Sequence, residues 1–113
     1  MQKSTAVSLR ALAALIALMA LLVMHGNANA ADAQVKIANF TFEPAMLTVK
    51  VGTTVIWVND DDIPHLVSEK DGKFRSSALD TDEKFSQTFK TPGTVDYFCV
   101  LHPHMTGKIV VEP

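Results

Sequence analysis

Short alternating runs of residues are the feature that most constrains the fold of this chain. Across residues 34–113, apolar side chains recur with the two-residue period of a strand, and no segment keeps the 3.6-residue period of a helix. Turn residues such as Gly52, Asp71-Gly72 and Pro92-Gly93 separate the runs at intervals of about 8–12 residues. Seven or eight short strands spaced in this way predict an all-β domain, either a sandwich or a small barrel. The clearest runs are 35–38, 47–51, 54–58, 85–89, 94–99 and 108–111, and segment 76–82 has no assignment.

The first thirty residues have a different character. Lys3 and Arg10 give a positive start, residues 11–24 carry no polar side chain, and Ala28-Asn29-Ala30 offers a small-residue cleavage site. This order is typical of a secretory signal peptide. The apolar run is shorter than the roughly 20 residues of a membrane span, although an uncleaved anchor is the alternative interpretation. We therefore predict a signal peptide over 1–30, one domain over 31–113 and export to the periplasm.

The predicted mature domain is acidic. Residues 31–113 contain eight Lys or Arg and twelve Asp or Glu, which gives a net charge of −4 with neutral histidines. Such a domain lacks the basic surface that nucleic-acid binding requires. Its field would instead favour a partner with a basic surface.

One loop near the end of the chain gathers residues that bind metals. Cys99, His102 and Met105 stand at Cys-x2-His-x2-Met spacing, and His65 follows a proline 34 residues before the cysteine. Two imidazoles, a thiolate and a weak thioether are the donor set of a blue-copper site. Zinc would also accept a cysteine and two histidines, but the thioether favours copper. A metal also explains a single unpaired cysteine in an exported protein, for which a buried, inert thiol is the alternative.

Other conspicuous residues receive structural interpretations. We expect Trp57 and Tyr97 in the core, and Met46 either in the core or in an apolar patch near the metal. The acidic run 60–62 is expected to form a solvated turn. His104 is expected to be an exposed loop imidazole that faces away from the metal.

The sequence resembles the cupredoxins, and within them the amicyanin and plastocyanin branch. The stretches that carry this resemblance are 48–55, 56–59, Pro64-His65, 92–97, Cys99-x2-His102-Pro103-x-Met105 and 107–112. The resemblance implies a Greek-key β-sandwich with one type 1 copper at one end. It implies His65, Cys99 and His102 as equatorial ligands, Met105 as the axial ligand, and an edge of His102 exposed within an apolar patch.

Three positions depart from the family pattern. Leu66 and Val100 replace the polar residues that tie the two ligand loops together in the family. Leu101 stands where proline is common, so we hypothesise that its N–H donates to the Cys99 sulfur and stabilises Cu(I).

The sequence therefore predicts an electron carrier and not an enzyme, because a copper enzyme needs an open position with further ligands. It would exchange single electrons between redox proteins, and the resemblance to amicyanins implies a dehydrogenase and a c-type cytochrome as partners. We expect a monomer with no nucleic-acid partner and no membrane attachment after cleavage. A copper-binding or copper-delivery protein is the main alternative function, and a metal-free adhesion or subunit domain is the second.

Overall fold

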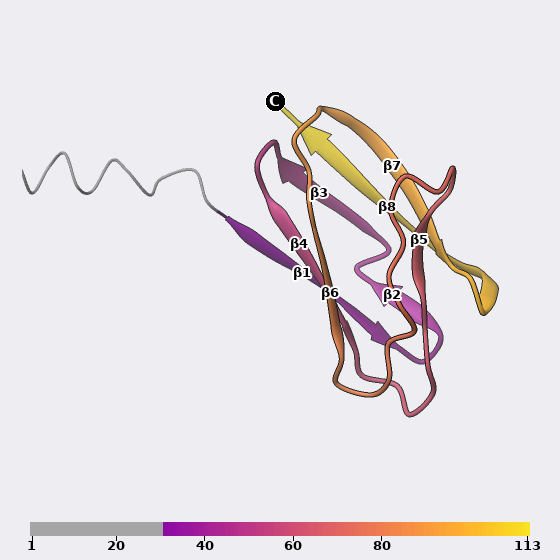
Figure 1. The fold of residues 1–113 in the computed structure, drawn as a ribbon. Helices are drawn as coiled ribbons and strands as arrows, with labels where there is room; N and C mark the ends of the chain where they lie inside the picture. The colour runs from indigo at the N-terminus through magenta and orange to yellow at the C-terminus, as the bar shows by residue number, and fades with distance from the viewer. Residues whose placement is uncertain (1–30) are drawn as a thin grey trace, which may run out of the picture. The chain divides into compact units, whose positions relative to one another are not determined.

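The computed structural model describes residues 31–113, so the predicted signal peptide lies outside the described residues. Eight strands follow one another in this part of the chain (Figure 1). They are β1 (Asp32–Ala38), β2 (Thr41–Glu43), β3 (Met46–Lys50), β4 (Thr54–Asn59), β5 (Val67–Glu69), β6 (Lys84–Thr88), β7 (Gly93–Cys99) and β8 (His102–Glu112).

The strands form two four-stranded sheets. The first has the order β2-β1-β4-β6 and the second the order β3-β8-β7-β5. Strand β1 runs parallel to β4 and β3 runs parallel to β8, while the remaining pairs are antiparallel. No helix occurs in residues 31–113, and the all-β sandwich predicted from the alternating runs is confirmed. Accordingly, this part of the chain contains no helix that is long and apolar enough to span a membrane.

The core lies between the sheets and is built from the inward side of each alternating run. Val55 and Trp57 of β4 are fully buried, and Trp57 packs edge-to-face against Tyr97 of β7 with ring centroids 5.3 Å apart. Alternate residues of β1, Val35 and Ile37, fill the same layer. The prediction that Trp57 and Tyr97 are core residues is confirmed, because strand alternation sends them to the buried face.

Strand β8 begins earlier than the sequence pattern indicated. We expected a loop that carries Cys99, His102 and Met105 and a last strand over 108–111, but His102 already pairs with Cys99 across a two-residue connection. The sequence pattern was misleading because residues 102–106 lack apolar alternation, and the pairing with β7 determines their conformation instead.

Two further expectations needed correction or completion. Met46 does not belong to the core, since 64% of its surface is exposed at the start of an edge strand.

The unassigned segment 76–82 contributes the buried residues Ser76 and Leu79, and Leu79 pairs with His65 as an isolated bridge. Isolated backbone hydrogen bonds, such as the pair between His65 and Leu79, and side-chain bonds such as that from Asn59 to the Leu79 carbonyl hold this segment in place without a continuous ladder.

Three connections meet at one end of the sandwich and position the site. They are the β1–β2 turn, the β4–β5 loop with His65, and the β7–β8 connection (Figure 1). Hydrogen bonds link all three, from the β1–β2 turn to Asp61 and from Leu66 to Cys99.

Candidate metal centre

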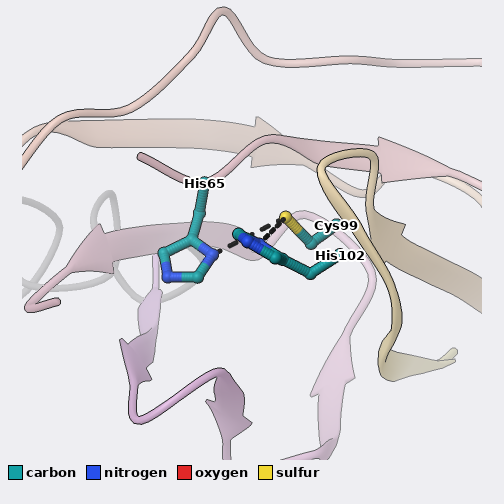
Figure 2. Close-up of side chains that lie close together, drawn as sticks. All are labelled: His65, Cys99 and His102. Carbon is teal, nitrogen blue, oxygen red and sulfur yellow. Dashed lines mark hydrogen bonds between the residues drawn. The ribbon is translucent and has the colours of Figure 1, made fainter. Parts of the chain in front are cut away.

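A thiol and two imidazoles meet at this end of the sandwich (Figure 2). The Cys99 Sγ lies 3.6 Å from Nδ1 of His65 and 3.6 Å from Nδ1 of His102. His65 and Cys99 are fully buried and His102 is half-buried. The structure thus brings together residues that the sequence separates by 34 positions.

The spacing of these three atoms fits one metal ion. With metal–sulfur and metal–nitrogen bonds of about 2.3 and 2.0 Å, trigonal or tetrahedral angles place sulfur and nitrogen about 3.5–3.8 Å apart. The observed separations of 3.6 Å lie within that range. All three ligand atoms lie within 4.8 Å of one another, so each can reach a common centre.

Met105 is the fourth residue that the sequence singled out. It lies on β8, three residues after His102, and is 5% exposed within the core cluster. His102 and Met105 therefore come from the same strand, and a thioether is a soft donor suited to Cu(I).

Asp61 is the residue of this centre that sequence reasoning missed. The predicted solvated turn at 60–62 is wrong for Asp61, because its Oδ2 lies 2.7 Å from Nε2 of His65 and its side chain is 12% exposed. The carboxylate accepts the Nε2 proton, which leaves the Nδ1 lone pair directed toward the thiol. The sequence does place Asp61 four residues before the candidate ligand His65. Because Asp61 stands between two other aspartates, this spacing did not distinguish it from its neighbours.

The same carboxylate also holds the β1–β2 turn. Its oxygens accept the backbone N–H groups of Asn39 at 2.6 Å and Phe40 at 3.1 Å. Burial raises the pKa of the Asp61 carboxyl, but the hydrogen bonds from Phe40, Asn39 and His65 together outweigh it, and the pKa lies below its usual 3.8. Asp61 is therefore an ionised acceptor at neutral pH.

Backbone hydrogen bonds tie the two ligand loops together. The N–H of Leu66 donates to Cys99 Sγ at 3.4 Å, and the N–H of Val100 donates to the carbonyl of Leu66 at 3.3 Å. These bonds connect the loops where the polar side chains of the family are replaced by Leu66 and Val100. The backbone donor to the sulfur is thus Leu66, and the hypothesis that Leu101 fills this role is not supported.

The outer side of the centre is apolar. Phe40 is 53% exposed and Leu101 is 49% exposed, and the Phe40 ring meets the His102 ring edge-on at 5.0 Å. His104 is exposed and lies outside the three-residue cluster, as the sequence predicted, but it belongs to strand β8 and not to a loop. The half-buried His102 consequently lies beside exposed apolar side chains.

Comparison with known proteins agrees with this geometry. A family model described as a cupredoxin-like domain matches residues 11–111. Amicyanin-alpha of Methylorubrum extorquens is 37% identical over 91 residues, which cover 76% of this chain and 76% of the relative. Amicyanin of Paracoccus denitrificans is 42% identical over 83 residues, or 69% of this chain and 63% of the relative. The chloroplastic plastocyanin of Tetradesmus obliquus is 33% identical, with 76% of this chain and 70% of the relative covered.

Solved structures give the same result. The Cu(I) form of an amicyanin variant superimposes with a TM-score of 0.69 at 38% identity, covering 72% of this chain and 82% of that chain. A purple cupredoxin from Nitrosopumilus maritimus gives a TM-score of 0.66 at 35% identity, covering 72% of this chain and all of that chain.

The relatives also agree with the chemistry of the centre. Amicyanins and plastocyanins are blue copper electron-transfer proteins rather than enzymes, and the cluster of His65, Cys99 and His102 resembles a copper site. The matched residues, the sandwich and the donor cluster lead to one conclusion: this chain belongs to the cupredoxin family.

Proposed function

We propose that residues 31–113 form a periplasmic carrier that shuttles single electrons between a donor and an acceptor redox protein. The observation that supports this proposal best is the buried thiol flanked by two imidazole nitrogens at equal distances of 3.6 Å. In this proposal His65, Cys99 and His102 are the equatorial ligands and Met105 is the axial ligand.

Each residue has a defined task. Copper supplies the one-electron chemistry when it is bound, by alternating between Cu(I) and Cu(II). The buried Cys99 thiolate and the Nδ1 atoms of both histidines provide donors that suit both oxidation states. Asp61 fixes the tautomer of His65, and the Leu66 N–H steadies the sulfur, so the donors keep their positions when the charge changes.

The surface near His102 is the proposed route for electrons. His102 is half-buried beside the exposed Phe40 and Leu101, so a partner that docks on this apolar face would approach a ligand edge. Similarity to amicyanins supports a dehydrogenase and a cytochrome as partner classes. The net charge of −4 on residues 31–113 favours a partner with a basic surface.

Copper addition tests the proposal directly. Purified residues 31–113 should take up one Cu(II), develop an intense thiolate-to-copper band in the visible spectrum, and lose and regain this band on reduction and reoxidation. Cys99→Ser should bind copper without the band, while His104→Ala, outside the cluster, should keep it. A colourless copper complex of the wild-type domain would refute the blue-copper assignment.

Two further measurements test the cellular part of the proposal. The exported protein should begin at Ala31, as N-terminal sequencing of a periplasmic fraction would show. A copper-delivery protein, the alternative, would transfer its ion to a partner protein and would not cycle in place. Stoichiometric copper loss to the partner during electron exchange would therefore favour delivery.

A further inference from the structure

The β1–β2 turn has a backbone conformation that its sequence does not favour. Asn39 and Phe40 connect Ala38 to Thr41, which pair with each other, and the two residues have φ values of 54° and 58°. A two-residue hairpin turn of this kind prefers Asn-Gly or Asp-Gly, because positive φ is costly for bulky residues. Phenylalanine therefore stands where glycine would fit best, which is a reason to seek a function for its side chain.

The Phe40 ring contacts both candidate histidine ligands. Its centroid lies 5.0 Å from that of His102 at an interplanar angle of 87°, and 5.8 Å from that of His65 at 85°. The two imidazoles themselves lie 5.1 Å apart. Edge-to-face geometry at these distances is favourable for aromatic pairs. A largely exposed ring thus bridges a buried imidazole and a half-buried one.

Asp61 explains how the turn is held against its own backbone preference. The carboxylate that fixes His65 Nε2 also accepts the N–H groups of Asn39 and Phe40. The turn, the ring that it carries and the orientation of His65 are therefore set by one side chain.

His102 has fewer restraints than His65. The ring of His65 is fully buried and is held at Nε2 by Asp61, whereas His102 is half-buried and the one hydrogen bond to its ring within residues 31–113 is that to Cys99 Sγ. The edge-on contact with Phe40 is therefore a main restraint on the orientation of His102.

From these contacts we propose that Phe40 is a positioning residue for the metal centre, whose ring keeps the His102 imidazole directed toward the Cys99 sulfur. The inference rests on the proposed function, in which both histidines bind copper. It assigns the strained turn a purpose, because the Phe40 ring that the turn carries contacts both imidazoles.

Three variants separate the ring from the turn. Phe40→Gly removes the ring and relieves the backbone strain, Asn39→Gly relieves the same kind of strain and keeps the ring, and Phe40→Tyr keeps an aromatic edge. Because glycine suits positive φ, both glycine variants should fold. Unfolding midpoints of the metal-free proteins would verify this before the site is compared.

The first measurement is the rate at which excess chelator removes copper from the loaded protein. Phe40→Gly should release copper about threefold to tenfold faster than wild type, which is the range that corresponds to one aromatic pair. Asn39→Gly and Phe40→Tyr should release it at the wild-type rate. Equal rates for Phe40→Gly and wild type would overturn the inference, and equal acceleration in both glycine variants would assign the effect to the turn instead of the ring.

The second measurement uses metal-free protein, so it decides the inference even if the wild type binds no copper and the proposed function fails. Proton NMR should show nuclear Overhauser contacts between the His102 ring and the β-protons of Cys99 in wild type and in Asn39→Gly. These contacts should weaken or vanish in Phe40→Gly. Contacts of unchanged intensity in Phe40→Gly would show that the ring does not orient His102.

Discussion

At the scale of single residues, Asp61 connects the proposed metal centre to the neighbouring β1–β2 turn. Its carboxylate accepts hydrogen bonds from the His65 imidazole and from two backbone N–H groups of a strained turn. The sequence could not distinguish it from Asp60 and Asp62, because only the folded loop turns the middle aspartate inward.

Replacing Asp61 should therefore weaken metal binding and stability together. Asp61→Ala is expected to lower copper affinity about 10- to 100-fold, because His65 loses the acceptor that fixes its tautomer. It should also lower the free energy of unfolding of the metal-free protein by about 1–3 kcal/mol, since two backbone donors lose their acceptor. Chelator competition and urea unfolding would measure the two effects.

Asp62→Ala is the matched control, because Asp62 is exposed and makes none of these bonds. It should leave both quantities near their wild-type values. An Asp61→Ala protein with undiminished copper affinity would contradict the role given to the carboxylate.

The buried hydroxyl of Tyr97 should make the free energy of unfolding fall at alkaline pH. Burial raises the pKa of its hydroxyl from 10.0 to about 12, and among residues 31–113 this oxygen has no hydrogen-bond partner. Between pH 10 and 12 the unfolded chain releases the proton and the folded chain keeps it, so the free energy of unfolding should fall by about 1.4 kcal/mol per pH unit.

Tyr97→Phe provides the comparison, since the chain has one tyrosine. The difference in stability between wild type and variant should be constant below pH 10 and should shift in favour of the variant above it. Urea unfolding at pH 8, 10 and 11.5 would measure this. Parallel pH profiles for the two proteins would mean that the folded state does not retain the phenolic proton.

At the scale of elements, the β7–β8 pair does most to build the site. Cys99 ends β7, His102 begins β8, and the two residues are cross-strand partners. Further along the same pair, Tyr97 lies opposite Gly107, and its ring occupies the space where a side chain at Gly107 would stand. The register of this hairpin thus sets both the spacing of two donors and the packing of a core aromatic.

Gly107→Ala should disturb this pair. The added Cβ would overlap the Tyr97 ring, so the free energy of unfolding should fall by about 1–3 kcal/mol, as for other overpacked cores. Gly72→Ala is the control, because nothing lies within 4 Å of its Cβ position, although its φ of 81° adds a strain of about 1 kcal/mol. Urea unfolding would measure both variants, and a Gly107→Ala protein as stable as wild type would argue against the close approach of Tyr97.

At the scale of the whole molecule, the centre links loops from both sheets. His65 lies between β4 of one sheet and β5 of the other, and Cys99 and His102 belong to the second sheet. An ion bound by all three would therefore resist separation of the sheets at this end, and binding to the folded state alone adds its free energy to stability.

Removing copper should accordingly lower stability. At free copper a thousandfold above the dissociation constant, the loaded domain should be about 4 kcal/mol more stable than the metal-free one. Thermal unfolding with and without copper would measure the difference. The increment should persist in His104→Ala and shrink in Cys99→Ala, and an increment that survives in Cys99→Ala would place the ion elsewhere.

The sequence by itself determined the fold class and singled out the proposed donor residues. Alternating runs separated by turns permit little besides a β-sandwich or barrel, and Cys99, His102 and Met105 stand close enough in the chain to be recognised by spacing. Local patterns of this kind are readable because strand period and ligand type are properties of neighbouring residues.

Only the tertiary structure decided how the centre is supported. The early start of β8, the inward turn of Asp61, the backbone donor Leu66 and the ring of Phe40 over two imidazoles all depend on contacts between distant segments. Phe40 lies 62 residues before His102, and no local period encodes a contact of that range. The sequence identifies the proposed donors of this site, and long-range pairing of loops and strands fixes the orientation of those side chains.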